Sequence, residues 1–135
     1  MNRSFNILVA DDDTSVCLVL STLLGRLGHH VEIVYDGKEA IMLLATKPGH
    51  FDILITDHRM PLVSGLELVH HLRKNEFSGK IMVISGFLTD ELLGAYRDKR
   101  VDKIIQKPFS VEELSSTLKD TLEQWSESAS LSPIK

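Results

Sequence analysis

The chain has 135 residues, of which 43% are hydrophobic and 25% are charged, as is typical of a single soluble domain. A formal net charge of −4 argues against a protein that binds the nucleic-acid backbone, and no apolar run approaches the roughly 20 residues that span a bilayer. The single Cys17 excludes an internal disulfide, and Met1–Ser4 leads directly into a predicted strand rather than into a signal peptide. We therefore expect a cytoplasmic protein that contacts neither nucleic acid nor a membrane.

Short apolar runs alternate with helical spacings along the chain. The runs predict strands that are buried on both faces, at residues 5–10, 31–35, 53–55, 80–84 and 103–106. The predicted helices begin after polar or glycine-containing turns, near Asp13, Asp36, Ser64, Thr89 and Ser110, with Asp13 as the expected cap of the first helix. Repeated strand–helix units with short connections indicate a parallel sheet with helices on both faces.

This pattern predicts an α/β fold of the doubly wound, flavodoxin-like (βα)5 type, with five parallel strands in the order 2-1-3-4-5. Residues 1–125 are expected to form this one domain. Residues 126–135 are rich in serine and show no periodicity, which predicts a disordered tail or a truncated linker.

Polar residues follow the ends of several predicted strands: Asp11 and Asp12, Asp57, Ser85 and Lys107. In the order 2-1-3-4-5 the first and third strands are neighbours, so their acids meet at the edge where open α/β sheets place their ligands. Clustered carboxylates without His or Cys neighbours favour Mg²⁺, and a lysine and a hydroxyl beside them suit a phosphoryl group. Asp57 is therefore predicted to be a carboxylate nucleophile that accepts phosphate.

Motifs along the chain resemble those of the receiver domain of two-component response regulators, over about residues 5–125. The matching motifs are Asp11-Asp12 after an apolar strand, Asp57 followed by Met60-Pro61 and Gly65, Ser85-Gly86, and Lys107-Pro108-Phe109. Such domains are signalling phosphoacceptors rather than conventional enzymes. The resemblance implies a domain that either stands alone or was cut from a longer hybrid kinase or regulator.

The resemblance implies that Asp57 accepts a phosphoryl group, in a Mg²⁺-dependent reaction, from the phosphohistidine of a sensor histidine kinase or from a phosphotransfer protein. It also implies a Mg²⁺ site made by the carboxylates of Asp11, Asp12 and Asp57 and the backbone carbonyl of Arg59.

The remaining motif residues are expected to bind the phosphoryl group and to change conformation in response to it. By the same resemblance, Lys107 contacts its oxygens and Ser85 swings to hydrogen-bond them, which shifts the population between two conformations. The Lys107-Pro108 peptide bond is expected to be cis.

The sequence departs from the usual receiver pattern at the switch. Receivers usually carry Tyr or Phe three residues before the lysine, whereas this chain has Ile104, so we expect a smaller rearrangement there. Arg59 and Phe87 lie two residues beyond Asp57 and Ser85. Our hypothesis is that they restrict attacking water and lengthen the lifetime of the phosphorylated state.

The fourth helix, fifth strand and fifth helix are expected to share an exposed face, with Tyr96, Lys103 and Trp125 on it. This face is the predicted surface for a downstream protein or for a weak homodimer, with a monomer as the other expected state. The histidines, His58 among them, are expected at the surface. The predicted core fillers include the methionines Met42, Met60 and Met82.

Two other functions fit parts of the pattern. Asp11 and Asp13 resemble the D-x-D motif of Mg²⁺-dependent phosphatases of the haloacid-dehalogenase type, as nucleophile and acid. That reading leaves Asp57 without a role, and no acidic pair at the end of a further strand follows Lys107. The other alternative is a degenerate receiver-like interaction module, against which the complete set of polar residues argues.

Overall fold

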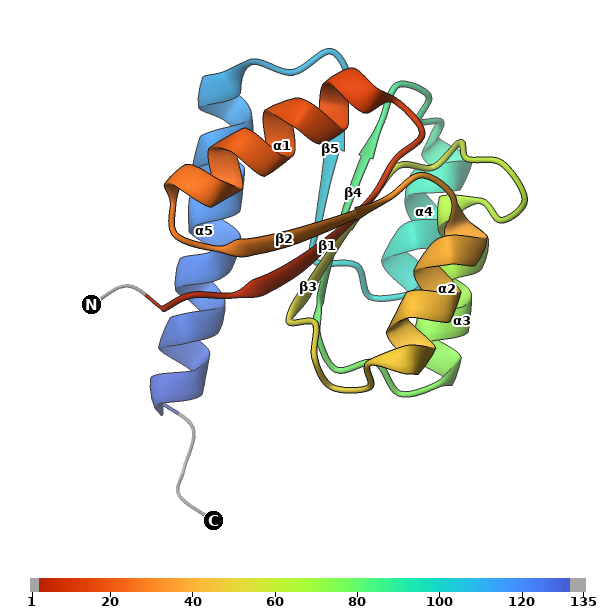
Figure 1. The fold of residues 1–135 in the computed structure, drawn as a ribbon. Coiled ribbons are helices and arrows are strands. Elements are labelled where there is room, and N and C mark those ends of the chain that lie inside the picture. Colours follow the sequence, from red (N-terminus) through yellow and green to blue (C-terminus); the bar gives the residue numbers. More distant parts are fainter. Residues whose placement is uncertain (1–2, 132–135) are drawn as a thin grey trace.

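The computed structural model describes residues 3–131, and the side chains of residues 3–123. Within this part of the chain, strands and helices alternate strictly (Figure 1). The strands are β1 (Asn6–Ala10), β2 (His30–Val34), β3 (Ile53–Thr56), β4 (Lys80–Ser85) and β5 (Lys103–Gln106). The helices are α1 (Thr14–Arg26), α2 (Gly37–Thr46), α3 (Gly65–Lys74), α4 (Asp90–Asp98) and α5 (Val111–Leu131).

The strands form a single sheet in the order β2-β1-β3-β4-β5, and every pair is parallel. The predicted flavodoxin-like (βα)5 fold is therefore confirmed. β1 lies next to β3 although α1, β2 and α2 separate them in the chain, so the order reverses at this point of the sheet. The carboxyl ends of all strands lie along the same edge, which we call the carboxyl edge.

Alternate residues of each strand face opposite layers of helices. In β1, Ile7 and Val9 join the core beneath α1 and α5, while Leu8 joins the core beneath α2, α3 and α4. β3 and β4 alternate in the same way. The two helical layers lie on opposite sides of the sheet in Figure 1. Burial of the central strands on both faces explains their continuous apolar sequences.

Side-chain caps fix where the helices begin. The Asp13 carboxylate accepts hydrogen bonds from the backbone nitrogens of Ser15 and Val16, which confirms its predicted role as the cap of α1. Ser64 and Glu67 form a reciprocal capping box at the start of α3. These caps satisfy backbone donors that have no partner within the helix, and they thereby set the loops that leave the carboxyl edge.

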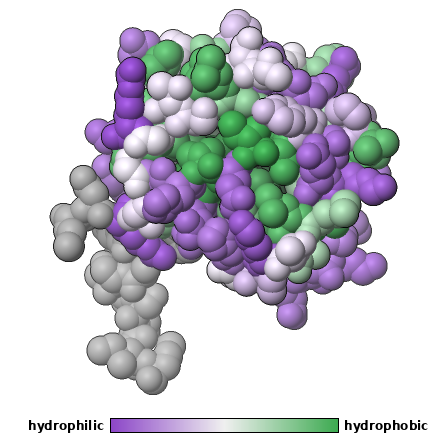
Figure 2. All heavy atoms as spheres, in the orientation of Figure 1, coloured by the Kyte–Doolittle hydropathy of each residue, from purple (hydrophilic) through white to green (hydrophobic). Residues whose placement is uncertain are grey.

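Hydrophobic residues gather across the middle of the face that α1 and α2 present in Figure 2, with hydrophilic residues around them. The edge strand β2 belongs to this region, and its residues Val31 and Ile33 are only half-buried. Met82 is fully buried and Met60 is half-buried, but the prediction of Met42 as a core residue is wrong, because 60% of it is exposed. α2 turns Ala40 towards the sheet, and Met42 falls on the opposite, outer side of the helix.

α5 continues to Leu131, beyond the expected domain boundary at residue 125. The division at that residue stays a prediction, and residues 132–135 lie outside the described residues. The side chain of Trp125 likewise lies outside the described side chains. No helix in the described part of the chain combines the length and apolar character needed to cross a membrane.

Candidate functional site

The carboxyl edge brings the predicted polar residues together. Asp11 and Asp12 follow β1, Asp57 follows the adjacent β3, Ser85 ends β4, and Lys107 follows β5. Carboxylate oxygens from Asp11, Asp12 and Asp57 all lie within 4.8 Å of one another. A parallel sheet with this strand order thus converts three separate segments of sequence into one acidic pocket.

Asp57 is held by backbone hydrogen bonds on both sides. Its own nitrogen donates to the carbonyl of Ala10 on β1 at 2.9 Å, and the nitrogen of His58 donates to Asp57 Oδ1 at 2.7 Å. The residue is only 7% exposed. The first bond fixes the position of the Asp57 backbone relative to the end of β1, and the second fixes the orientation of its carboxylate.

Asp11 is the most buried acid of the pocket, with 2% exposure, whereas Asp12 is exposed. Burial raises the pKa of Asp11 to about 6, against the opposing effect of a hydrogen bond from the Asp13 nitrogen to Asp11 Oδ1 at 2.9 Å. The nearby negative charge of Asp57 also acts to raise this pKa, whereas the positive charge of Lys107 acts to lower it. The negative form of Asp11 is therefore costly in the pocket as it stands.

Lys107 places its ammonium group between the two buried acids. Nζ lies 3.2 Å from Asp11 Oδ2 and 3.3 Å from Asp57 Oδ2. Burial on its own lowers the pKa of Lys107, but attraction by the two carboxylates outweighs burial, so the pKa stands above its ordinary value and the ammonium form is favoured. The Lys107-Pro108 bond is cis, as predicted.

The donor set fits a hard divalent cation. It consists of carboxylate oxygens from three residues, and two of these are buried. Carboxylate oxygens are the ligands that Mg²⁺ prefers, and a cation among them would offset the repulsion that raises the pKa of Asp11. The pocket can therefore hold a metal ion. The contribution of the Arg59 carbonyl stays a prediction.

The remaining predicted site residues surround this pocket. Ser85 is 1% exposed; its hydroxyl oxygen accepts from the nitrogen of Phe87 at 3.3 Å, and its carbonyl accepts from the nitrogen of Lys107 at 2.8 Å. The guanidinium of Arg59 stacks over the Phe87 ring, with its carbon 4.5 Å from the ring centre. Ile104 is half-buried and packs against the core beneath α2, α3 and α4.

One residue beside the pocket does not lie where the sequence predicts. Tyr96 was expected on an exposed face, but it lies on the inner side of α4 and is fully buried, and its hydroxyl lies 2.6 Å from Nδ1 of the half-buried His58. Burial lowers the pKa of His58 and raises that of Tyr96, so both rings favour their neutral forms. The spacing of Leu92 and Tyr96, four residues apart on one side of α4, was the available signal.

Cys17 is buried in α1. Its sulfur lies 3.3 Å from the carbonyl oxygen of Asp11, and burial raises the pKa of its thiol to about 11. A thiol with this pKa is protonated near neutral pH, which does not suit a nucleophile.

Comparisons with known proteins agree with the geometry of the pocket. A family model described as the response regulator receiver domain matches residues 7–119. A response regulator receiver protein of Anaeromyxobacter sp. (strain Fw109-5) is 36% identical over 104 residues, which cover 77% of this chain and 43% of that protein. The response regulator MprA of Mycobacterium bovis is 34% identical over 119 residues, covering 88% of this chain and 51% of that protein.

Solved structures show the same fold. The receiver domain of the Francisella response regulator 1452 superposes with a TM-score of 0.78 at 27% identity, covering 89% of this chain and 98% of that one. The chain thus spans nearly all of a solved receiver domain but only about half the length of the curated relatives that it matches.

Proposed function

Because the chain belongs to the response regulator receiver domain family, we propose that Asp57 accepts a phosphoryl group from a phosphohistidine in a Mg²⁺-dependent reaction. A receiver implies a partner histidine kinase, and its role is that of a signalling phosphoacceptor rather than of a conventional enzyme. The donor is the phosphohistidine of such a kinase or of a phosphotransfer protein. The observation that carries this proposal is the position of the Asp57 carboxylate between the acids of β1 and the ammonium of Lys107.

The transfer moves one phosphoryl group between two side chains. An oxygen of the Asp57 carboxylate attacks phosphorus, the bond from phosphorus to the histidine nitrogen breaks, and the imidazole leaves with the electron pair of that bond. Lys107 contributes positive charge beside the oxygens of the group being transferred. Mg²⁺ held by Asp11, Asp12, Asp57 and the Arg59 carbonyl supplies further positive charge when bound.

We propose that Ser85 reports the phosphoryl group to the rest of the domain. Its buried position at the end of β4 puts its hydroxyl on the same edge as Asp57, where a rotation would let it donate to a phosphoryl oxygen. Ile104 lies on neighbouring β5 and can repack against the core beneath α4 without displacing a large ring. The result is a shift in the population of two conformations rather than a new fold.

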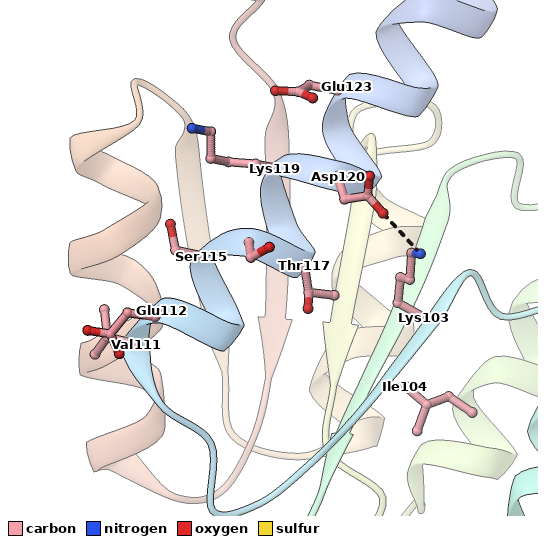
Figure 3. A pocket seen from close by; sticks show the side chains of 10 residues that line it. Lys103, Ile104, Val111, Glu112, Ser115, Thr117, Lys119, Asp120 and Glu123 are labelled. Carbon is pink, nitrogen blue, oxygen red and sulfur yellow. Dashed lines mark hydrogen bonds and ion pairs between the residues drawn. The ribbon is translucent and has the colours of Figure 1, made fainter.

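We propose that a downstream protein binds the face formed by α4, β5 and α5. A groove of about 860 Å³ runs between β5 and α5, lined in part by Lys103, Glu112 and Asp120 (Figure 3). Lys103 points to Asp120, 3.3 Å away, while Ile104 points away from α5. Since β5 also leads into Lys107, movement at the pocket can reach this groove. We further propose that the protein acts in the cytoplasm as a monomer or weak homodimer and does not bind nucleic acid directly.

The phosphatase alternative is less well supported. It needs the Asp13 carboxylate as an acid, but that carboxylate accepts two backbone hydrogen bonds at the start of α1. It also leaves unexplained why Lys107 contacts Asp57. A degenerate interaction module would need no such set of aligned charges. The chain spans about half the length of the curated relatives that it matches.

The proposal is tested by intact mass after incubation with Mg²⁺ and acetyl phosphate. We expect the parent to gain one phosphoryl group and the Asp57→Asn variant to gain none. Chelation of Mg²⁺ is expected to abolish the gain in the parent. An unmodified parent in the presence of Mg²⁺ would favour the degenerate module.

A further inference from the structure

The hydrogen bond between His58 and Tyr96 connects two parts of the chain that the proposed chemistry does not use. Tyr96 lies in the last turn of α4 and is fully buried. Its hydroxyl oxygen lies 2.6 Å from His58 Nδ1, and the two rings meet edge to face, with centres 5.7 Å apart and planes at 83°. The geometry therefore fixes both rings, not only the two polar atoms.

The backbone of His58 is also tied to its neighbours on both sides. Its nitrogen donates to Asp57 Oδ1 at 2.7 Å, and its carbonyl accepts from the nitrogen of Gly65, the first residue of α3, at 2.8 Å. His58 thus contacts the phosphoacceptor carboxylate through its main chain and α4 through its side chain. A displacement of the His58 ring would also displace the N–H group that orients Asp57.

The junction is too tightly packed to adjust freely. A Cβ atom at Gly65 would lie 2.8 Å from the Tyr96 hydroxyl oxygen and 2.9 Å from the His58 Cα. The end of β3, the start of α3 and the last turn of α4 therefore meet at the Tyr96 hydroxyl. Movement of α4 relative to this point must break the hydrogen bond or carry His58 with it.

We propose that His58 and Tyr96 are positioning residues, whose hydrogen bond holds the segment carrying Asp57 in its reactive geometry and couples that segment to α4. This inference rests on the proposed function, since it concerns the same phosphoacceptor. It assigns to the pair a role in the rate of phosphoryl transfer. It also makes α4 an element that responds when Asp57 is modified.

The central variant is Tyr96→Phe, which removes only the hydroxyl oxygen and keeps the buried ring. Loss of one buried hydrogen bond is expected to slow phosphorylation of Asp57 by acetyl phosphate roughly three- to tenfold. The matched control is Tyr35→Phe, because Tyr35 is the other tyrosine and its side chain is 47% exposed. We expect this control to react at the parent rate.

A double-mutant cycle separates positioning from a general loss of packing. In a His58→Phe background the partner of the hydroxyl is already gone, so adding Tyr96→Phe is expected to change the rate by less than about 1.5-fold. Amide hydrogen exchange of α4 provides a second readout. In the parent, we expect phosphorylation to change α4 exchange, and in Tyr96→Phe we expect most of this change to disappear while exchange around Ser85 still responds.

The outcomes distinguish the inference from the function beneath it. A parent that takes up no phosphoryl group would overturn both. A phosphorylated parent with a Tyr96→Phe variant of equal rate and equal α4 response would overturn the inference alone. Equal effects of Tyr96→Phe with and without His58 would also overturn it, because the hydroxyl would then act through something other than this hydrogen bond. Thermal unfolding of each variant checks that all are folded during the assay.

Discussion

The ammonium nitrogen of Lys107 lies 3.3 Å from Oδ2 of Asp57, although 50 residues separate them in the chain. The strands that carry them are not neighbours, since β4 lies between β3 and β5. Lys107 therefore reaches across the end of β4 to Asp57 and to Asp11. This arrangement leaves a fixed positive charge beside the atom that is proposed to react.

Replacement of Lys107 by alanine is expected to slow phosphorylation of Asp57 by about 10²-fold, because the variant loses a preorganised charge beside the developing phosphoryl oxygens. The matched control is Lys103→Ala, since Lys103 lies on β5, the strand that leads into Lys107, but pairs with Asp120 on α5. Rates measured by intact mass with acetyl phosphate and Mg²⁺ test this expectation. Equal rates for the parent and Lys107→Ala would contradict it.

Asp11 is expected to make the free energy of unfolding of the metal-free protein fall as pH rises from about 4 to about 6. The pKa of Asp11 is raised from its ordinary 3.8 to about 6, chiefly by burial, so the folded state binds more protons than the unfolded state between these values. The difference corresponds to about 3 kcal/mol of stability that is present at low pH and lost above pH 6.

The Asp11→Asn variant removes this charge. At pH 7.5 and without divalent cations, we expect it to be more stable than the parent by up to about 3 kcal/mol. We also expect Mg²⁺ to raise the Tm of the parent more than that of the variant, because the variant lacks one ligand. Thermal unfolding across pH, with and without Mg²⁺, makes both measurements. A variant less stable than the parent under metal-free conditions would refute the assignment.

Replacement of Arg59 by alanine is expected to shorten the lifetime of the phosphorylated state about two- to fivefold. Arg59 and Phe87 stack together beside the pocket, and the variant loses this contact, which has the strength of one exposed cation–π pair. The measurement is the decay of phosphorylated protein after removal of the donor. Arg97→Ala, an exposed arginine at the end of α4, is the control. If Arg59→Ala loses phosphate no faster than the parent, the pair does not restrict water.

A methyl group at Gly65 is expected to destabilise the fold by roughly 1–3 kcal/mol, as overpacking does. The added Cβ would lie 2.2 Å from the carbonyl oxygen of Asp57, which is backbone and cannot rotate aside. Gly94→Ala is the matched control, because Gly94 lies inside α4 with nothing within 4 Å of an added Cβ, and alanine there should stabilise by about 0.5–1 kcal/mol. Urea unfolding of both variants tests the pair. Similar stabilities would contradict the close packing at Gly65.

The fold and the residues that form the pocket could be predicted because both depend on short stretches of sequence. Apolar runs of the kind seen at Ile53–Thr56 identify strands buried on both faces, and parallel pairing then places whatever follows each strand on one edge. Once the strands are assigned, their parallel pairing is enough to predict that Asp11, Asp57 and Lys107 lie close together. Even the Asp13 cap follows from its position before a helical spacing.

Side-chain direction on short helices was harder to predict. α4 has only 9 residues, so the single spacing of Leu92 and Tyr96 was the one signal for its inner side, and Tyr96 was assigned to the wrong side. His58 is the residue after Asp57 in the chain, but its half-buried state depends on Tyr96, which is 38 residues away. Met42 failed for a related reason, because hydrophobicity alone does not place a residue on the inner side of α2.

The central claim is that Asp57 itself carries the phosphoryl group. Borohydride reduction of the protein after incubation with Mg²⁺ and acetyl phosphate would convert an aspartyl phosphate to homoserine, which peptide mass spectrometry can locate. We predict homoserine at position 57 in the parent and unmodified Asp11 and Asp12 in the same sample. Homoserine at position 11, with Asp57 unmodified, would contradict the account and favour the phosphatase alternative.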